Sequence, residues 1–294
     1  MVREEGEQRF SVGNVICRRA FCGRLGMVAT IPLLSSWAWA QESQLPLRTP
    51  GLEHFGMLVP DVETAGRFYA RVFNPKLHQE IFRGSLRYYV TLGPVGYIAL
   101  GAIGEREIVP EIDHYCNVVE DYDSPALAEE MKSMGLESGN FGMIPDPDDL
   151  RLQLLPVPGG LASQIEPAGR IVEEDALVTP HGLDHFILTV TDLDESLEWY
   201  RAFFGEEASR DSTSAWFEFS SELLGHTRLG IKVVPEGEKP KIDHFSVKVA
   251  PFDRDAVARQ LTDLGATIIA SEDEGEEVLR FKDLNGIGAE LKAI

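Results

Sequence analysis

Histidine recurs at matching positions along the chain, each time within a similar short motif. The segment Gly51–Phe55 reads Gly-Leu-Glu-His-Phe, and the segment Gly182–Phe186, 131 positions later, reads Gly-Leu-Asp-His-Phe. The tripeptide Ile-Asp-His at 112–114 returns at 242–244, 130 positions later. Imidazole ligates metal ions and transfers protons near neutral pH. Two motifs that repeat at nearly the same spacing indicate an internal duplication, and histidine chemistry is a candidate function of each copy.

The residues that follow each motif repeat as well. Asp61 and Asp192 stand where a helix N-cap belongs, and an amphipathic stretch follows each of them. A second pair of helices is expected at 126–134 and 256–264, each ended by a glycine that suits a helix C-cap. The opening segments alternate as strands do, and several short strands are expected after each helix. The chain therefore contains four copies of one unit, arranged as two halves.

The first forty residues have the composition of an export signal. Arg18 and Arg19 precede a weakly apolar stretch at about 25–39, which ends in the tripeptide Ala-Trp-Ala at 38–40. A basic region, an apolar region and a small-x-small site in this order are typical of a secretory signal, and the arginine pair resembles the twin-arginine type. We expect cleavage near Ala40, the twin-arginine export machinery as a partner, and a periplasmic or secreted mature protein.

Charge and length restrict the remaining partners. The 294 residues include 27 basic and 48 acidic ones, for a net charge of −21. A chain this acidic is repelled by nucleic acid phosphates and by anionic lipid, so we expect no nucleic acid partner and no membrane association of the mature form. No apolar run reaches the roughly 18 residues of a spanning helix. Small molecules and metal ions remain as ligands, and the oligomeric state stays open.

The paired units resemble a known group of proteins. A strand–helix–strands unit with histidine on its first strand, and a late Asp-x-Asn-Gly segment followed by Glu-Leu at 283–291, is similar to the vicinal oxygen chelate superfamily of glyoxalases, extradiol dioxygenases, epimerases and resistance proteins. The resemblance covers about 51–294. It implies an α+β fold in which four βαβββ units pair into two domains with curved, partly open mixed sheets. The expected segments are the signal (1–40), a linker (41–50), an N-terminal domain (51–160), a second linker (161–180) and a C-terminal domain (181–294).

This resemblance implies a metal site in the C-terminal half. In the superfamily the ligands come from the first and last strands of two units, and the matching positions here are His185, His244 and Glu290. Two imidazoles and one carboxylate, with the other coordination positions open, form the facial triad of non-haem iron(II) oxygen chemistry. Such a site accepts a substrate that chelates through two neighbouring oxygens, with O₂ or water beside it. Fe(II) is the favoured metal, and Mn(II), Zn(II) or Ni(II) would fill the same set.

The matching positions of the N-terminal half are His54, His114 and Gln153. The amide oxygen of glutamine is neutral and is a weak ligand for a transition metal. Two alternatives stay open for this half. It either forms a second metal site, or it is a degenerate copy whose histidines form hydrogen bonds within the core.

Three further residues are candidates for catalytic roles. Extradiol enzymes resemble one another in a tyrosine ten residues before the ligand glutamate, where this chain has Arg280. A buried arginine needs an anionic partner, which is an acidic side chain such as Glu290 or a carboxylate or enolate on the substrate. His226 is the candidate acid/base histidine, either lining the cavity or lying in an exposed turn. Glu218 is the candidate base of an isomerase-type proton transfer.

Three functions follow from these residues. The leading hypothesis is an exported Fe(II)-dependent dioxygenase of the extradiol type, acting on a small substrate that chelates the metal through vicinal oxygens. The second is a metal-dependent isomerase, epimerase or lyase of the glyoxalase type. The third is a non-catalytic small-molecule binding protein of the resistance type. The sequence does not identify the substrate.

Overall fold

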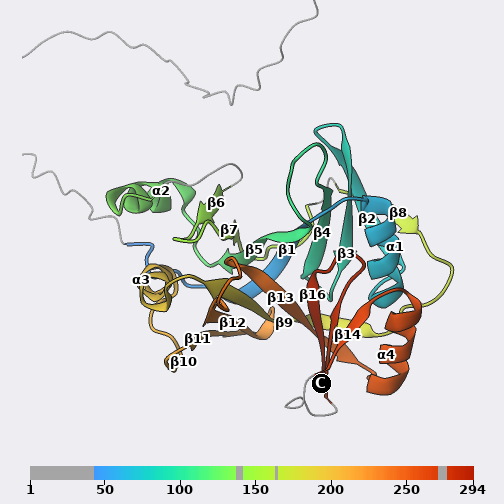
Figure 1. The fold of residues 1–294 in the computed structure, drawn as a ribbon. Coiled ribbons are helices and arrows are strands. Elements are labelled where there is room, and N and C mark those ends of the chain that lie inside the picture. The colour runs from blue at the N-terminus through green and yellow to red at the C-terminus, as the bar shows by residue number, and fades with distance from the viewer. Residues whose placement is uncertain (1–42, 137–141, 163–164, 271–276) are drawn as a thin grey trace, which may run out of the picture. The chain divides into compact units, whose positions relative to one another are not determined.

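The structure is a computed structural model that describes residues 43–136, 142–162, 165–270 and 277–294 (Figure 1). The predicted export signal at 1–40, with its cleavage position near Ala40, lies outside these residues. Within the described ranges, no helix is both long and apolar enough to cross a membrane.

The first half of the described chain forms one eight-stranded mixed sheet in the order β6-β7-β5-β1-β4-β3-β2-β8. Its elements are β1 (Gly51–Val59), α1 (Val62–Val72), β2 (Lys76–Phe82), β3 (Ser85–Thr91), β4 (Tyr97–Ala102), β5 (Glu111–Val119), α2 (Ser124–Ser133), β6 (Met143–Pro145), β7 (Arg151–Pro156) and β8 (Glu166–Arg170). The central strands β1 and β5 are antiparallel, and β4 and β7 flank them in parallel. The first strands of two units therefore meet at the centre of the sheet.

The second half repeats this arrangement in the order β10-β11-β12-β9-β13-β16-β15-β14. Its elements are β9 (Thr179–Val190), α3 (Leu193–Phe204), β10 (Ser209–Arg210), β11 (Ser214–Ser221), β12 (Gly225–Val233), β13 (Lys241–Ala250), α4 (Arg254–Asp263), β14 (Thr267–Ile269), β15 (Val278–Lys282) and β16 (Gly288–Ala293). Here β9 and β13 are the central antiparallel pair, flanked in parallel by β12 and β16. The predicted α+β fold, with four units paired into two vicinal oxygen chelate domains, is confirmed.

The helix boundaries agree with the capping residues expected from the sequence. The side chain of Asp61 accepts from the amides of Glu63 and Thr64 at 2.9 and 3.1 Å, and Asp192 caps α3 in the same way. The glycines at the ends of the two shorter helices, Gly135 and Gly265, have φ of 75° and 92°. Such positive angles are routine only for glycine, so these residues end α2 and α4.

One strand lies where the sequence indicated a linker. β8 falls within 161–180 and pairs antiparallel with β2 at the edge of the N-terminal sheet. Its sequence is Glu-Pro-Ala-Gly-Arg, and proline and glycine are both disfavoured in strands. Proline is tolerated on an edge strand, where its missing N–H faces away from the ladder. This segment is therefore a strand of the sheet, although its proline and glycine predict a linker.

The two sheets share one core. The ring of Phe55 on β1 lies 4.4 Å from that of Phe245 on β13 and 5.4 Å from that of Phe186 on β9, centroid to centroid. Tyr115 on β5 lies 5.8 Å from Phe186. These residues belong to a single cluster of buried apolar side chains from both halves. Since side chains alternate along a strand, neighbours of these rings point to the opposite faces of the two sheets.

A buried hydrogen bond links the first helix of each half to the last turn of the other half. Tyr69 on α1 donates to Asp283 Oδ2 at 2.8 Å, and Tyr200 on α3 donates to Asp146 Oδ2 at 2.8 Å. The other carboxylate oxygen of Asp283 accepts from the amides that follow it, which shapes the turn before β16. The duplication has therefore produced the same cross-domain contact twice, and each contact supports the turn before a final strand.

Asp146 makes stability depend on pH. Burial raises the pKa of Asp146 to about 6, although Tyr200 and two backbone amides donate to its carboxylate. The folded state then keeps a proton that the unfolded chain releases near pH 4, so the contribution of Asp146 to stability falls as pH rises through this window. Between pH 5 and 7.5 we expect wild type to lose about 1–2 kcal/mol relative to Asp146→Asn, measured by urea unfolding. Parallel pH profiles of the two proteins would contradict this assignment.

Candidate metal centre

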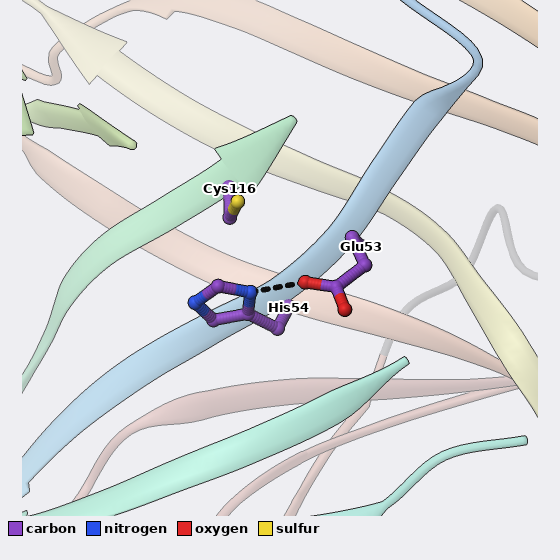
Figure 2. Close-up of side chains that lie close together, drawn as sticks. All are labelled: Glu53, His54 and Cys116. Carbon is purple, nitrogen blue, oxygen red and sulfur yellow. Dashed lines mark hydrogen bonds and ion pairs between the residues drawn. The ribbon is translucent and has the colours of Figure 1, made fainter. Parts of the chain in front are cut away.

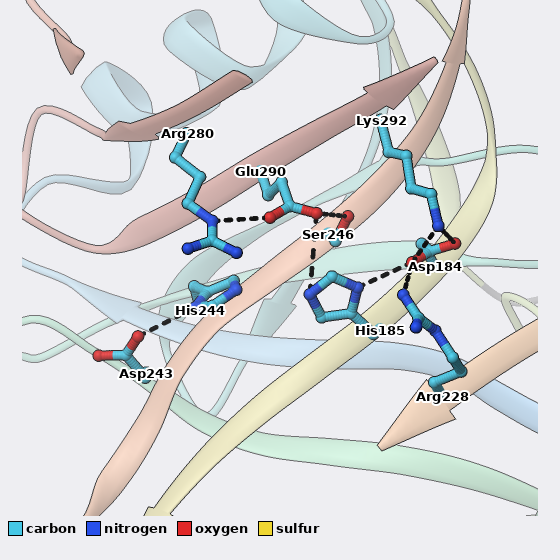
Figure 3. Close-up of polar contacts among 9 residues, drawn as sticks. All are labelled: Asp184, His185, Arg228, Asp243, His244, Ser246, Arg280, Glu290 and Lys292. Atoms are coloured by element: carbon cyan, nitrogen blue, oxygen red, sulfur yellow. Dashed lines mark hydrogen bonds and ion pairs between the residues drawn. The ribbon is translucent and has the colours of Figure 1, made fainter. Parts of the chain in front are cut away.

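His185 on β9, His244 on β13 and Glu290 on β16 meet on one face of the C-terminal sheet, which we call the site face (Figure 3). Their ligand atoms all lie within 4.8 Å of one another, and all three residues are buried. The register of the sheet explains this meeting, because Ser246 on the middle strand pairs with His185 on one side and with Glu290 on the other. The structure thus brings together the three residues that the resemblance implied.

Each of the two imidazoles turns one nitrogen toward this meeting point. Nδ1 of His185 lies 2.8 Å from Asp184 Oδ2, and Nδ1 of His244 lies 2.9 Å from Asp243 Oδ2. A carboxylate only accepts, so in the neutral form of each ring Nδ1 carries the hydrogen and Nε2 keeps the lone pair. Both Nε2 atoms are buried and have no hydrogen-bond partner among the described residues. A buried polar atom left in this state costs about 1–3 kcal/mol, so the pair fits a cation that would accept both lone pairs.

Local bulges in the sheet explain how an aspartate can reach the histidine next to it. Adjacent residues on a regular strand point to opposite faces. The pairing of β9 with β13 shifts by one residue at Asp184 and again at Asp243, so each aspartate is the extra residue of a bulge. A bulge re-aims side chains, and bulges are frequent beside active sites. The carboxylate can therefore approach the ring of the residue that follows it.

Electrostatics keep both aspartates ionised. Asp184 accepts from Arg228 Nη2 at 2.9 Å and from Lys292 Nζ at 3.0 Å in addition to His185. Burial would raise the pKa of Asp184, but the hydrogen bonds from His185, Arg228 and Lys292 outweigh it and hold this pKa well below its usual range. The hydrogen bond from His244 likewise lowers the pKa of Asp243. Carboxylates that orient metal-binding imidazoles also raise their basicity.

Glu290 is a buried anion with two fixed oxygens. Ser246 Oγ donates to its Oε1 at 2.8 Å, and Arg280 Nε donates to its Oε2 at 2.8 Å. Burial would raise the pKa of Glu290, but His185, Arg280 and Ser246 together lower it. Burial lowers the pKa of His185, which favours the neutral ring. The site therefore offers the neutral imidazole of His185, a second imidazole from His244 and one hard anionic oxygen, a set of ligand types that suits a divalent metal.

The three candidate catalytic residues lie at different distances from this centre. Arg280 contacts Glu290, which is one of the two partners expected from the sequence. Glu218 is exposed and shares a face of β11 with Trp216, whose ring lies 5.6 Å from that of His185. His226 is exposed at the start of β12, and its Nδ1 lies 3.0 Å from Ser220 Oγ. His226 is therefore not brought into the cluster, and its catalytic role stays a prediction.

Sequence reasoning missed the residues that orient the ligands. Asp184 and Asp243 directly precede His185 and His244, and an acidic residue precedes His54 and His114 in the other half too. This repeated acidic-His dipeptide was a usable signal. It was missed because strand alternation places neighbouring side chains on opposite faces unless a bulge intervenes.

The N-terminal half has the same bulges and the same carboxylate–histidine contacts, but its histidines have different partners. The pairing of β1 with β5 shifts at Glu53 and at Asp113, and these carboxylates contact Nδ1 of His54 and of His114. However, Nε2 of His54 already lies 2.9 Å from Gln153 Oε1. His54 is therefore engaged through both ring nitrogens, unlike the two C-terminal histidines.

A different trio in this half brings potential ligand atoms together. Glu53, His54 and Cys116 are buried, and their ligand atoms lie within 4.8 Å of one another (Figure 2). The two oxygens of Glu53 already accept from His54 and from the amide of Gly160. Burial, and then the Glu53 carboxylate, raise the pKa of the Cys116 thiol well above its ordinary value. Metals bind the thiolate, so this trio is a poorer metal site than the C-terminal one.

Comparisons with known proteins agree with this fold. Residues 185–289 match the glyoxalase-like domain family; the match includes both histidines and ends one residue before Glu290. No curated protein matches the chain by sequence. This domain match and the shared fold agree with the predicted resemblance to the vicinal oxygen chelate superfamily.

Three solved structures illustrate the shared fold. The 2,3-dioxygenase LapB from Pseudomonas sp. KL28 has a TM-score of 0.60 at 14% identity, covering 85% of this chain and 93% of its own. A Mn(II)-bound glyoxalase from Novosphingobium aromaticivorans has a TM-score of 0.58 at 14% identity, with 84% and 83% covered. Homoprotocatechuate 2,3-dioxygenase from Arthrobacter globiformis has a TM-score of 0.57 at 14% identity, with 86% and 82% covered. At such identities the likeness establishes the fold, and the site has to be argued from its own residues.

Removal of one orienting carboxylate tests the site. We expect Asp243→Ala to weaken divalent metal binding about 10–100-fold, because the His244 ring loses the partner that fixes its tautomer and direction. The matched control is Asp113→Ala, the equivalent change in the N-terminal half, which should leave metal affinity unchanged. Competition with a chromogenic chelator measures both. Equal effects of the two substitutions would show that Asp243 does not act through the proposed ligand.

Proposed function

We propose that the protein is an Fe(II)-dependent oxygenase of a small substrate that chelates the metal through neighbouring oxygens, with His185, His244 and Glu290 as the metal ligands. The single observation that carries this proposal is the pair of buried imidazole nitrogens that lack a hydrogen-bond partner beside an ionised carboxylate, with His185 Nε2 3.8 Å from Glu290 Oε1. Support comes from the fold, since the dioxygenases named above share it over 85% and 86% of the chain. Two imidazoles and one carboxylate that leave coordination positions open are typical of non-haem iron oxygenases.

The metal would polarise the chelating oxygens of the substrate, and iron would add redox capacity toward O₂. The chain's own residues prepare this chemistry. Asp184 and Asp243 hold the two rings in one tautomer, and Ser246 and Arg280 hold the carboxylate of Glu290. The site is therefore organised before a substrate arrives, which lowers the cost of reaching the reactive arrangement.

Cations near the ligands favour an anionic substrate. Arg228 and Lys292 contact Asp184, and Lys248 pairs with Lys292 across β13 and β16. Arg280 lies on the strand beside Glu290. Asp184 balances Arg228 and Lys292, and Glu290 balances Arg280. Lys248 donates to the His226 carbonyl and forms no ion pair with a described carboxylate, so it is the cation that would attract a carboxylate or an enolate. We therefore expect the substrate to carry an anionic group besides the two chelating oxygens.

One observation favours a second candidate, a metal-dependent isomerase or lyase of the glyoxalase type. Glu218 shares a strand face with Trp216, which contacts His185, so a carboxylate borders the site face. It would move a proton on a metal-stabilised enolate. The Mn(II)-bound glyoxalase has the same fold. In this case O₂ would not be consumed.

Metal analysis and oxygen uptake distinguish these candidates. We expect protein purified without oxygen to hold one Fe(II) per chain and to consume O₂ with carboxylated catechols, while Glu290→Ala loses both metal and activity. Glu218→Gln should keep both, since Glu218 has no role in oxygen insertion. Bound Zn, Mn or Ni without O₂ uptake would favour the isomerase or lyase, and metal binding without any turnover would favour a binding protein.

We also propose that the protein is exported by the twin-arginine route. The support is the order of the arginine pair, the apolar stretch and the Ala-Trp-Ala site within residues 1–40. This route carries folded proteins, which suits a chain that receives its metal before export. We expect N-terminal sequencing of the mature protein to begin at Gln41, and substitution of Arg18 and Arg19 by lysine to retain the precursor in the cytoplasm. A cytoplasmic protein that keeps its first forty residues would contradict export.

A further inference from the structure

The N-terminal sheet encloses a cavity of about 280 Å³ at the place equivalent to the metal centre. His54, His114 and Gln153 line it, at the positions that match the three C-terminal ligands. A cavity of this size has room for a single substituted ring. The groups that line its walls determine which ligand it would bind.

The cavity is poorly suited to a metal ion. Nδ1 of His54 contacts the buried carboxylate of Glu53, and Nε2 lies 2.9 Å from the amide oxygen of Gln153. Both ring nitrogens of His54 therefore already have a hydrogen-bonding partner among the described residues. A ring nitrogen held by such a partner is not free to bind a metal, and Gln153 brings no charge.

Two polar groups of the wall do remain open. Nδ1 of His114 lies 2.8 Å from Asp113 Oδ2, so its Nε2 is an acceptor, and no described residue donates to it. Burial lowers the pKa of His114, which keeps the ring neutral. Tyr97 is 7% exposed and lines the cavity, and its hydroxyl makes no hydrogen bond to any described residue. Both groups would pair with a hydroxyl on a ligand.

The same walls supply flat surfaces and one cation. The ring of Tyr97 stacks on His54, with 4.3 Å between centroids and 8° between planes, and Tyr89 meets Tyr97 edge-on. Arg87 lines the cavity, with its guanidinium carbon 3.9 Å from the centre of the Phe82 ring, and it forms no ion pair with a described carboxylate. Aromatic walls favour a planar ligand, and a guanidinium favours a carboxylate.

We propose that this cavity is a second, metal-independent binding site for a single-ring aromatic acid that bears a hydroxyl group. The hydroxyl would pair with His114 and Tyr97, the ring would lie among the aromatic side chains, and the carboxylate would meet Arg87. The proposal does not rest on the function of the C-terminal site. It gives the N-terminal domain a role that does not require a bound metal.

Calorimetric titration of the full mature chain with 3- and 4-hydroxybenzoate tests this inference. After removal of metal with a chelator, we expect one molecule of at least one of these acids to bind per chain. Arg87→Gln should weaken that binding at least about tenfold, because a charge-assisted hydrogen bond is lost. Tyr97→Phe should weaken it severalfold, and the corresponding hydroxybenzamide should bind less tightly than the acid.

The controls use the other domain. His185→Ala should abolish metal binding and leave this titration unchanged, and Arg87→Gln should keep full metal binding, which shows that the variant is folded. The inference is overturned if neither acid binds the metal-free protein below about 1 mM. It is also overturned if Arg87→Gln binds as well as the parent, or if His185→Ala loses the binding.

Discussion

The candidate site depends on one short contact, the hydrogen bond between Nδ1 of a histidine and the carboxylate of the residue before it. This contact needs a β-bulge, because adjacent side chains on a regular strand diverge. In the C-terminal half it fixes the tautomer of His185 and His244 and leaves their Nε2 atoms buried without a partner. The shared aromatic core packs the two sheets against each other, and the two reciprocal Tyr–Asp contacts join the two halves.

The two halves share the contact between histidine Nδ1 and the preceding carboxylate, but they differ in what surrounds the histidines. All four histidines of the repeat keep an acidic neighbour in contact with Nδ1. In the C-terminal half the third position is Glu290, an anion that contacts Ser246 and Arg280 and leaves Nε2 of both histidines without a hydrogen bond. In the N-terminal half it is Gln153, whose amide oxygen occupies His54. The two sites therefore differ chiefly at this third position: with the carboxylate of Glu290 the site suits a metal ion, and with the amide of Gln153 the cavity suits an organic ligand.

Much of the fold, and the meeting of three candidate ligands, could be predicted from the sequence. The repeat spacing located the four units, the capping aspartates located the helices, and the resemblance assigned His185, His244 and Glu290 to one site. The edge strand β8 was hidden because its proline and glycine resemble a linker. The bulges at Asp184 and Asp243 were hidden because a bulge is a property of how two strands pair and leaves no fixed pattern in either one. The exposed position of His226 depends on the length of the β11–β12 hairpin, which alternation alone does not give.

We infer that one divalent metal binds in the C-terminal domain and that none binds in the N-terminal domain. The most direct measurement is the anomalous scattering of crystals of the protein loaded with Fe(II) under anaerobic conditions. We expect one peak per chain, at a metal position bound by Nε2 of His185, Nε2 of His244 and the carboxylate of Glu290. A peak between Glu53, His54 and Cys116, or equal peaks in both domains, would contradict it.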